Sequence, residues 1–410
     1  MRIVWHCQDV VGAKMAGPGI RAVELSRRLA GRHEVTLVAQ GAGELANDAV
    51  HASENLGAAL AGADALITQG FGFPLPHLLR FRGRLVLDLY DPVQLEQLAH
   101  MGARPTPEQI VQVGYVRRRL QYLVRRADHL LCASRPQRAL WLGWLGACGR
   151  LTPQALADDA EASRLLAMVP FGLPESPPQR AGSPLRAAIG AGAEVRVALW
   201  AGGLWDWMDP ALAVTAAALA RQRVPDLQLA LLAGQRPGNA APPMRAAADA
   251  ARAVAGAGAH FIERWVPYEE RGAWLLDADL AVSAHKPSLE AELAFRTRLL
   301  DCLWAGLPAA CTEGDVLASE GGRQGWARTA PVGDARALAD AMVALCDPEE
   351  NARARTAASA AAKERTWQRS ADTLLALLDA PAPPRARLLD KDTPALAGVF
   401  ARKALRKLFR

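Results

Sequence analysis

Residues 280–312 read LAVSAHKPSLEAELAFRTRLLDCLWAGLPAACT, and this stretch decides the fold class. Short apolar runs at 280–284 and 309–312 flank a longer segment in which Leu299 and Leu303 recur at helical spacing. Apolar runs of strand length on either side of a helix predict a β-α-β unit, whose two strands are parallel and belong to one sheet. The stretch therefore predicts an α/β protein.

The same alternation recurs in both halves of the chain. A Pro-rich segment, VPFGLPESPPQRAGSP at 169–184, separates the halves and has the composition of an extended linker. We therefore predict two doubly wound domains, 1–178 and 179–380, followed by a Pro-rich linker and a basic helix at 381–410. Ligands bind such sheets at the carboxyl ends of the strands. The predicted strands are 2–6, 34–39, 63–68, 85–89 and 129–134 in the first half, and 195–200, 227–233, 260–263, 280–284 and 309–312 in the second.

The excess positive charge lies at one end of the chain. The 410 residues carry a formal net charge of +6, and residues 385–410 contain eight Lys or Arg against two Asp, so residues 1–384 are neutral overall. A nucleic-acid-binding protein is expected to spread its basic residues over a folded domain. The distribution therefore argues against a nucleic-acid partner.

The basic end has the pattern of a membrane-surface helix. Within 395–410, Leu396, Phe400 and Leu405 recur at helical spacing, with basic residues beside them. Such a helix is attracted to an anionic bilayer surface, and we expect peripheral contact with the inner face of the cell membrane. A solvated helix, or one packed on a domain, is the alternative.

Cysteine and aspartate patterns bear on cofactors and location. The six cysteines occur singly, without a C-x-x-C pair, which predicts neither a disulfide framework nor a zinc site. The sequence has no apolar run of transmembrane or signal-peptide length, so we expect a cytoplasmic location. Asp277 and Asp279 form a D-x-D pattern, but they lie where a helix leads into a strand, which favours capping over metal binding. We expect no essential metal and no cofactor.

Small and acidic residues follow predicted strands of the first half. Gly17 and Gly19 precede a helix, where backbone amides can approach an anion; a tight turn is the alternative. Their spacing differs from the dinucleotide fingerprint, and Ala39 and Gln40 stand where that fingerprint has an acidic residue, which argues against a nicotinamide or flavin dinucleotide. Asp91 follows a strand end and can accept a proton or bind a hydroxyl, unless it only caps the next segment.

A Gly-Gly loop with two tryptophans follows the first strand of the second half. Gly202 and Gly203 permit backbone amides to approach a ligand closely. Trp205 and Trp207 can stack on a sugar or base, and Asp206 can hydrogen-bond hydroxyl groups. Core packing is the alternative for the tryptophans, but their positions on both sides of an aspartate favour ligand binding.

The opening stretch contains the densest set of candidates. Arg296 and Thr297 lie at the N-terminus of its helix, where backbone amides and a guanidinium form a diphosphate site. Asp301 projects from the same helix face, and His285 ends the preceding strand either as a ligand residue or as a core histidine. Arg298 is the weaker candidate, because it can serve only to cover the sheet.

Six motifs, together with the Gly202–Gly203 loop, occur in an order typical of one family. They are GPGIRAVEL at 17–25, TQGFG at 68–72, DLYDP at 88–92, VPFGLP at 169–174, WVPYEERG at 265–272 and FRTRLLD…WAGLP at 295–308. In these motifs the chain resembles the GT-B-fold glycosyltransferases of family 4, which are retaining enzymes that use nucleotide sugars. The resemblance covers residues 1 to about 375 and implies two Rossmann-like domains that face each other across a cleft.

The chain departs from the family pattern at a pair of glutamates. The family has two glutamates with seven residues between them. Here Asp301 holds the second position, and the resemblance implies that it binds the ribose of the nucleotide. Leu293 holds the first position, so we expect Glu290 or Glu292 to take over its role.

A pair of cations is also missing. Family members commonly carry an Arg and a Lys just after the Gly-Gly loop, where this chain has Trp205–Trp207. We expect Arg296 and Arg236 to supply the positive charge for the diphosphate instead.

Together these residues and the resemblance predict a glycosyltransferase that moves a sugar from a nucleoside-diphosphate sugar to a hydroxyl acceptor, and the resemblance implies that the anomeric configuration is retained. We expect the base near the backbone of 265–267, the ribose at Asp301 and the diphosphate at the Gly-Gly amides. The expected catalytic residues are Asp91, His285, Glu290 and Arg296; the donor-binding residues are Gly202, Gly203, Trp205, Asp206, Arg236, Trp265, Val266, Pro267, Thr297 and Asp301; and the acceptor-binding residues are Gly17, Gly19 and Arg21.

The expected acceptor is a glycan or a lipid-linked intermediate of surface polysaccharide, lipopolysaccharide or glycolipid synthesis, because the basic helix would hold the enzyme at a membrane. Two alternatives stay open. One is a GT-B-like nucleotide-sugar epimerase. The other is a non-catalytic, membrane-tethered subunit that binds a nucleotide sugar, which Leu293 in place of a glutamate would fit.

Overall fold

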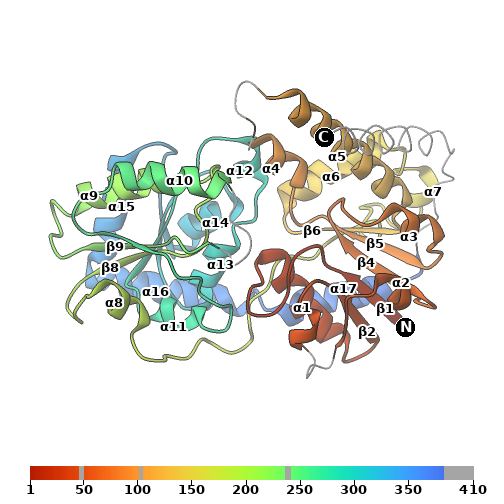
Figure 1. Ribbon diagram of the computed structural model, residues 1–410, viewed down its shortest axis with the longest axis horizontal. Helices are drawn as coiled ribbons and strands as arrows, with labels where there is room; N and C mark the ends of the chain where they lie inside the picture. Colours follow the sequence, from red (N-terminus) through yellow and green to blue (C-terminus); the bar gives the residue numbers. More distant parts are fainter. Residues whose placement is uncertain (46–49, 100, 102–104, 236–241, 383–410) are drawn as a thin grey trace, which may run out of the picture. The chain divides into compact units, whose positions relative to one another are not determined.

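The computed structural model describes residues 1–45, 50–99, 101, 105–235 and 242–382 (Figure 1). Arg236 and the predicted helix at 395–410 lie outside these residues. The chain divides into two compact units. Unit 1 comprises residues 1–12, 18–170 and 371–410, and unit 2 comprises residues 13–17 and 171–370.

Unit 1 contains a fully parallel sheet in the order β3-β2-β1-β4-β5-β6-β7. Its strands are β1 Arg2–His6, β2 Glu34–Val38, β3 His51–Ser53, β4 Ala65–Gln69, β5 Arg84–Asp88, β6 His129–Cys132 and β7 Leu166–Met168. Its helices are α1 Gly17–Leu29, the 3-10 helix η1 Ala42–Leu45, α2 Leu56–Leu60, α3 Leu75–Arg80, α4 Val93–Ala99, α5 Pro107–Arg126, α6 Arg135–Ala147, α7 Pro153–Leu156 and most of α17, Trp367–Asp379.

Local signals explain why the longest helix of unit 1 begins where it does. The Thr106 side chain accepts a hydrogen bond from the Gln109 backbone N–H at 3.3 Å, and the Gln109 side chain accepts one from the Thr106 N–H at 2.7 Å. This capping box satisfies two donors that the start of α5 would otherwise leave unpaired. Val116, Leu120 and Leu123 then line one face of α5 and are buried in the core beside strands β4 to β6.

Unit 2 contains a second parallel sheet in the order β10-β9-β8-β11-β12-β13. Its strands are β8 Val197–Trp200, β9 Gln228–Leu232, β10 Ala259–Ile262, β11 Leu280–Ser283, β12 Ala309–Thr312 and β13 Ala327–Ala330. Its helices are α8 Pro184–Ile189, α9 Pro210–Ala220, α10 Pro242–Ala253, α11 Arg271–Leu276, α12 Leu289–Leu293, α13 Thr297–Trp304, α14 Val316–Gln324, α15 Ala335–Cys346 and α16 Pro348–Lys363.

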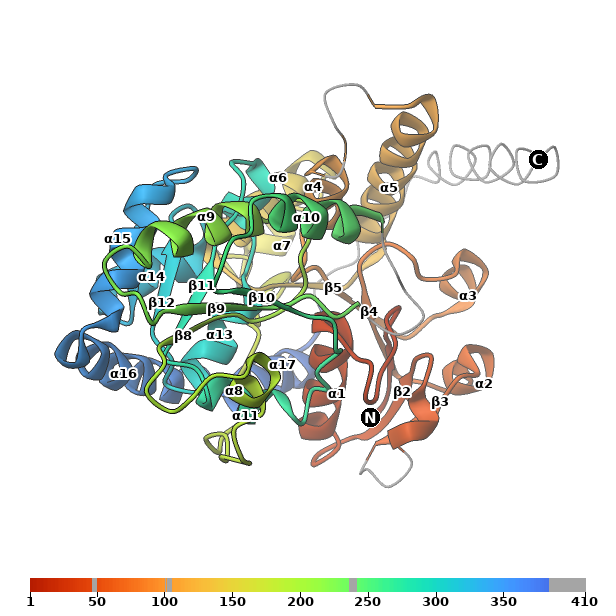
Figure 2. The same cartoon turned by 60° about the vertical axis from the view of Figure 1, so that its left-hand side comes forward.

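Helices cover both faces of the second sheet. In both views α9, α10 and α15 lie on one side of it, and α8 and α11 lie on the other (Figure 1, Figure 2). The buried residues of α9 are mainly alanines, and their small side chains let α9 lie close to both the sheet and α15. The core of unit 2 therefore forms without large side chains in α9.

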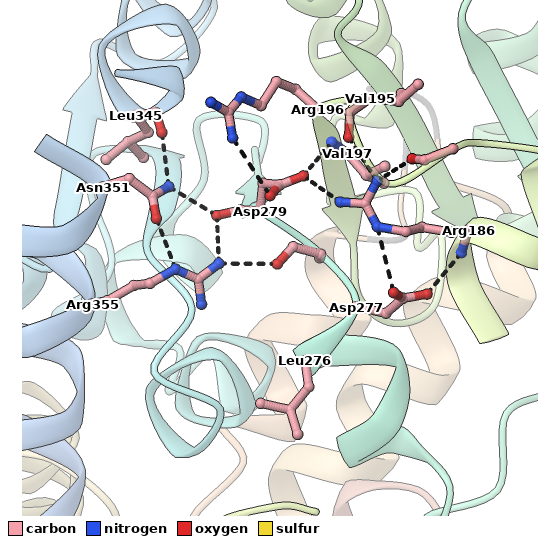
Figure 3. A network of polar contacts seen from close by, with 12 residues as sticks. Arg186, Val195, Arg196, Val197, Leu276, Asp277, Asp279, Leu345, Asn351 and Arg355 are labelled. Atoms are coloured by element: carbon pink, nitrogen blue, oxygen red, sulfur yellow. Dashed lines mark hydrogen bonds and ion pairs between the residues drawn. The ribbon is translucent and has the colours of Figure 1, made fainter. Parts of the chain in front are cut away.

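A network of polar and charged residues joins α8, α11, β11 and α16 of unit 2 (Figure 3). Asp277 ends α11 and Asp279 leads into β11, and Arg186 of α8 contacts both carboxylates. The Asp279 carboxylate also accepts a hydrogen bond from the Val197 N–H at 2.8 Å, and its backbone carbonyl accepts bonds from α16. The D-x-D pattern therefore fixes backbone groups at the entry to β11.

The α/β class and the two parallel sheets agree with the prediction. All ten predicted strands are present, with ends within two residues of those predicted. The described part of the chain has three further strands, β3, β7 and β13, which have only three or four residues each; β3 and β13 also contain polar residues and no continuous apolar run. The division between the units falls at 170/171 in place of 178/179, and residues 371–379 belong to unit 1.

Candidate active site

Each sheet has one place where the chain order reverses. In unit 1 it lies between β1 and β4, and in unit 2 it lies between β8 and β11. The loops that leave these neighbouring strands diverge to opposite faces, which opens a crevice at their carboxyl ends.

The Gly-Gly loop of unit 2 leaves β8 at its switch point. Gly202 has a φ of +117°, a conformation that residues with side chains rarely adopt. The guanidinium of Arg298 packs on this loop, with Cζ 3.7 Å from the place that a Cβ of residue 202 would take. Its Nη2 donates a hydrogen bond to the Gly203 carbonyl at 3.0 Å, and its Cζ lies 5.0 Å from the centre of the Trp200 ring. The Gly-Gly loop therefore packs directly against the Arg298 guanidinium.

Arg298 keeps an unused donor at this position. Its buried Nη1 has no hydrogen-bond partner among the residues that the structure describes. Burial lowers the pKa of Arg298 to about 10, and the neighbouring Arg296 adds to the shift, so the side chain stays charged at neutral pH. The R-T-R pattern contains both arginines, and the sequence predicts Arg296, not Arg298, as the diphosphate ligand.

Arg296 is already paired. Its Nη1 and Nη2 donate to the two carboxylate oxygens of Glu290 at 2.9 and 2.7 Å, and both side chains are buried. The pair carries no net charge, so Arg296 does not supply the free cation that the sequence predicted. Glu290 of α12 points inward whereas Glu292 is exposed, and the geometry thus favours Glu290 of the two glutamates.

His285 lies at the end of β11 beside this pair. Its side chain is 2% exposed, and both its backbone N–H and its Nδ1 contact the Thr312 hydroxyl at 3.1 Å. Burial lowers the pKa of His285 to about 4, with a further contribution from Arg296. The imidazole is therefore neutral at pH 7 and is not a general acid in its protonated form.

A buried carboxylate that the sequence did not single out completes this edge of the sheet. Asp315 follows β12 and accepts hydrogen bonds from the Leu317 and Ala318 N–H groups at 2.8 and 2.9 Å, which begins α14. Burial raises its pKa. Its charge interacts with that of Arg296, so Asp315 belongs to the same buried set as Glu290.

The predicted ribose ligand is part of a second ion pair. Thr297 opens α13, and Asp301 lies one turn later with its side chain 31% exposed. Its Oδ1 accepts a hydrogen bond from Arg271 Nε at 3.1 Å. The Arg271 guanidinium lies between two rings, 3.6 Å from the Tyr268 centre and 4.4 Å from the Trp304 centre. Burial lowers the pKa of Arg271, but Asp301 and Tyr268 outweigh it and the net pKa is raised.

The two tryptophans after the Gly-Gly loop contact each other. The Trp205 and Trp207 rings stack at 4.8 Å with an angle of 8° between their planes, and both pack against the core of unit 2. One face of each ring is therefore covered by the other. Asp206 lies between them, and the donor contacts expected of Trp205 and Asp206 stay predictions.

The loop at 265–267 follows β10 and is held by contacts with two other loops. Gly234, after β9, lies so close to the Arg264 carbonyl that any Cβ at 234 would collide with it. The Trp265 Nε1 donates a hydrogen bond to the Ala13 carbonyl at 3.1 Å. Trp265, Val266 and Pro267, which are predicted to contact the base, thus lie in a loop whose position is fixed by these contacts.

In unit 1, the predicted acceptor residue Arg21 is an interior cation. It is fully buried, with Nε and Nη2 donating to Asp88 at 2.8 and 3.0 Å and further bonds to the carbonyls of Val169 and Pro170. Its Cζ lies 4.9 Å from the centre of the Tyr90 ring. Arg21 therefore ties α1 to β5 and to the residues that follow β7.

A cavity of about 250 Å³ lies at the switch point of unit 1 and is named here the unit 1 cavity. Asp91 lines it, and the functional role expected of this aspartate stays a prediction. Gly17 and Gly19 lie in the first turn of α1, neither with a positive φ, so they are not a left-handed turn. The cavity is lined by Gln8, Asp9, Pro18, Gln69, Gly70, Phe71, Asp88, Tyr90, Asp91, Val93 and Glu96.

The described part of the chain contains no group of three His, Cys, Asp or Glu residues placed to hold a metal ion. None of the described helices combines the length and the apolar character needed to cross a bilayer.

Comparison with known proteins identifies the fold. No family model and no curated protein sequence matches the chain. Among solved structures, it is similar to HepE of Anabaena in complex with UDP and glucose (15% identity, TM-score 0.66, covering 93% of this chain and 100% of that one). It is also similar to the sucrose-phosphate synthase of Thermosynechococcus elongatus (16%, 0.61, 92% and 98%) and to WaaG, a glycosyltransferase involved in lipopolysaccharide biosynthesis (13%, 0.62, 92% and 100%). The chain therefore has the GT-B fold of these glycosyltransferases.

Proposed function

We propose that the protein is a retaining glycosyltransferase that transfers a sugar from a nucleoside-diphosphate sugar to a hydroxyl group. The observation that carries the proposal is Arg298, a buried cation with an unused donor on the Gly-Gly loop of unit 2. HepE, which has the same fold, was solved with UDP-glucose. A diphosphate is the ligand whose charge and acceptor oxygens fit such a site.

In this proposal the diphosphate contacts the amides of Gly202 and Gly203, the Arg298 Nη1 and the N-terminus of α13 at Thr297. These donors act where negative charge increases as the bond between the anomeric carbon and the diphosphate oxygen breaks. The electron pair of that bond goes to the diphosphate. The acceptor oxygen forms the new bond on the same face, and its proton goes to the departing diphosphate, which accounts for retention.

The neighbouring residues then have positioning roles. Glu290 holds the Arg296 guanidinium in place. Because the pair has no net charge, it can orient the ligand through hydrogen bonds without adding positive charge to the site. Neutral His285 can bind a hydroxyl of the donor sugar through Nε2, which borders Gly314. Asp301 is proposed to bind the ribose beside Arg271. On the acceptor side, Asp91 is proposed to contact the acceptor hydroxyl, whereas Arg21 is not, because its donors are engaged inside unit 1.

Binding measurements on Arg298→Met test the site. Affinity for UDP, GDP and dTDP is compared with affinity for the corresponding nucleosides. We expect the best diphosphate to bind roughly tenfold to a hundredfold more weakly to the variant, because a charged hydrogen bond is worth about 1.5–3 kcal/mol. Nucleoside affinity should not change.

The matched control is Arg353→Met, which alters an exposed arginine of α16. Equal diphosphate affinity in Arg298→Met and in the control would contradict the proposed site. Release of nucleoside diphosphate from the best nucleotide sugar should require an acceptor. Sugar interconversion without such release would instead indicate an epimerase, and binding without any turnover a non-catalytic subunit.

A further inference from the structure

We infer that the unit 1 cavity binds an uncharged, hydroxyl-rich sugar unit and discriminates against phosphorylated or carboxylated sugars. The inference rests on the proposed function only in naming this sugar as the acceptor. It concerns the chemistry of the cavity, which lies entirely within unit 1.

The charge at the cavity is acidic. Four carboxylates line it, those of Asp9, Asp88, Asp91 and Glu96, and the described lining residues include no Lys, Arg or His. Arg21 forms an ion pair with Asp88, but Arg21 is fully buried and does not line the cavity. An anionic ligand would therefore meet like charge in a partly desolvated space, which is strongly unfavourable.

The hydrogen-bonding groups of the cavity favour a ligand that donates hydrogen bonds. Gln69 lines the cavity with its side chain 5% exposed. Its Nε2 donates to the Pro18 carbonyl at 3.0 Å, which fixes the orientation of the amide because a carbonyl can only accept. Its Oε1 is buried without a partner in the described structure. A buried acceptor without a partner is costly, and a ligand hydroxyl would supply the missing donor.

The size and the aromatic residues fit one sugar ring. A volume of about 250 Å³ is below the ~300–1,000 Å³ typical of sites for drug-sized ligands, so it suits a monosaccharide unit. Phe71 and Tyr90 offer apolar surface for the C–H face of a ring. Burial and the Asp91 and Asp88 carboxylates raise the pKa of Tyr90, so its hydroxyl remains protonated.

Ligand-observed NMR saturation transfer on the full chain, without nucleotide, tests the inference. The probes are glucose, mannose and galactose, each compared with its 6-phosphate, and glucuronate. We expect at least one neutral hexose to bind, and its 6-phosphate to bind about tenfold or more weakly at low salt. The difference should shrink in high salt.

Three variants assign the effect to the cavity. Gln69→Leu should weaken binding of the neutral hexose, and Glu96→Gln, on partly exposed α4, should reduce the discrimination against the phosphate. Glu161→Gln, an exposed residue of unit 1, is the matched control and should change neither. Because Glu96 is partly exposed, its variant remains informative even if Gln69→Leu does not fold.

Two results would overturn the inference: equal or tighter binding of the 6-phosphates, or no binding of any neutral hexose. Failure of the proposed function looks different. In that case no nucleotide sugar is turned over, while the neutral hexose still binds and still depends on Gln69. Conversely, turnover with a phosphorylated acceptor would retain the glycosyltransferase and reject the cavity assignment.

Discussion

Arg296 and Arg298 are two positions apart, yet their surroundings give them different chemistry. Glu290 takes up the charge of Arg296, whereas Arg298 donates to a backbone carbonyl and lies against an indole ring and a glycine loop. Arg296 is the N-cap of α13 and has a non-helical backbone (φ −71°, ψ 85°), whereas Arg298 lies in the first turn of the helix. The choice between the two arginines therefore depends on what each side chain contacts, which the sequence does not contain.

Buried histidines make stability depend on pH at the residue scale. The pKa values of His285 and His6 are lowered to about 4, mainly by burial, from the ordinary value of 6.5. Between these values the unfolded chain binds protons that the folded chain does not. The stabilisation is thus complete above pH 6.5 and falls as the pH falls toward 4, by up to about 3 kcal/mol for one such histidine.

The measurement is the urea midpoint at pH 7.5 and at pH 5 for the unmodified chain and for His285→Gln. We expect a smaller difference between the two pH values in His285→Gln. His51→Gln is the control, because His51 is exposed. An unchanged pH dependence in His285→Gln would assign the effect to other groups.

At the scale of elements, one arginine connects α8 to the end of α11 and the start of β11 in unit 2 (Figure 3). Arg186 of α8 contacts Asp277, which is almost fully buried, and Asp279 at the start of β11. Arg186→Met would remove the ion pair of the buried Asp277 and leave Asp279 only its longer ion-pair contact with Arg196 at 4.0 Å, and we expect a loss of about 3 kcal/mol in the free energy of unfolding.

The exposed ion pairs of Arg353 offer the comparison, because pairs of that kind contribute about 0–1 kcal/mol. Denaturant midpoints of Arg186→Met and Arg353→Met should differ accordingly. The diphosphate affinity of the folded Arg186→Met protein should remain normal. A midpoint equal to that of Arg353→Met would mean that the network does not stabilise unit 2.

Most elements could be predicted from the sequence because a buried parallel strand shows as a continuous apolar run. Strand β13, ARTA at 327–330, has no such run, and its pairing with β12 is visible only in three dimensions. The candidate site was less predictable. Arg21 and Asp88 are 67 residues apart, and neither residue type indicates that the two form a buried pair. Asp91 and the Gly-Gly loop could be proposed from the sequence because they follow strand ends, and their roles stay predictions.

At the scale of the whole molecule, the charge distribution predicts where the protein works. The eight basic residues within 385–410 lie outside the described residues, and the rest of the chain is neutral overall. Each basic residue near an anionic bilayer contributes about 1 kcal/mol. We expect the full chain to co-sediment with phosphatidylglycerol-containing vesicles and to be released by salt.

A chain that ends at Ala380 should remain in the supernatant while keeping its diphosphate affinity. Vesicles of phosphatidylcholine alone control for charge. Equal partitioning of the two chains would remove the membrane proposal and leave the glycosyltransferase proposal intact.

Unit 1 is discontinuous in sequence, and this has a consequence for synthesis. Helix α17 returns to unit 1, where Leu374 and Leu378 are buried and Asp379 pairs with Arg32 at 3.0 Å. A ribosome adds about 5–20 residues per second, so the roughly 200 residues of unit 2 take about 10–40 s to make. During that time the sheet of unit 1 exists without its last helix. The part of the protein that is made first is therefore completed last.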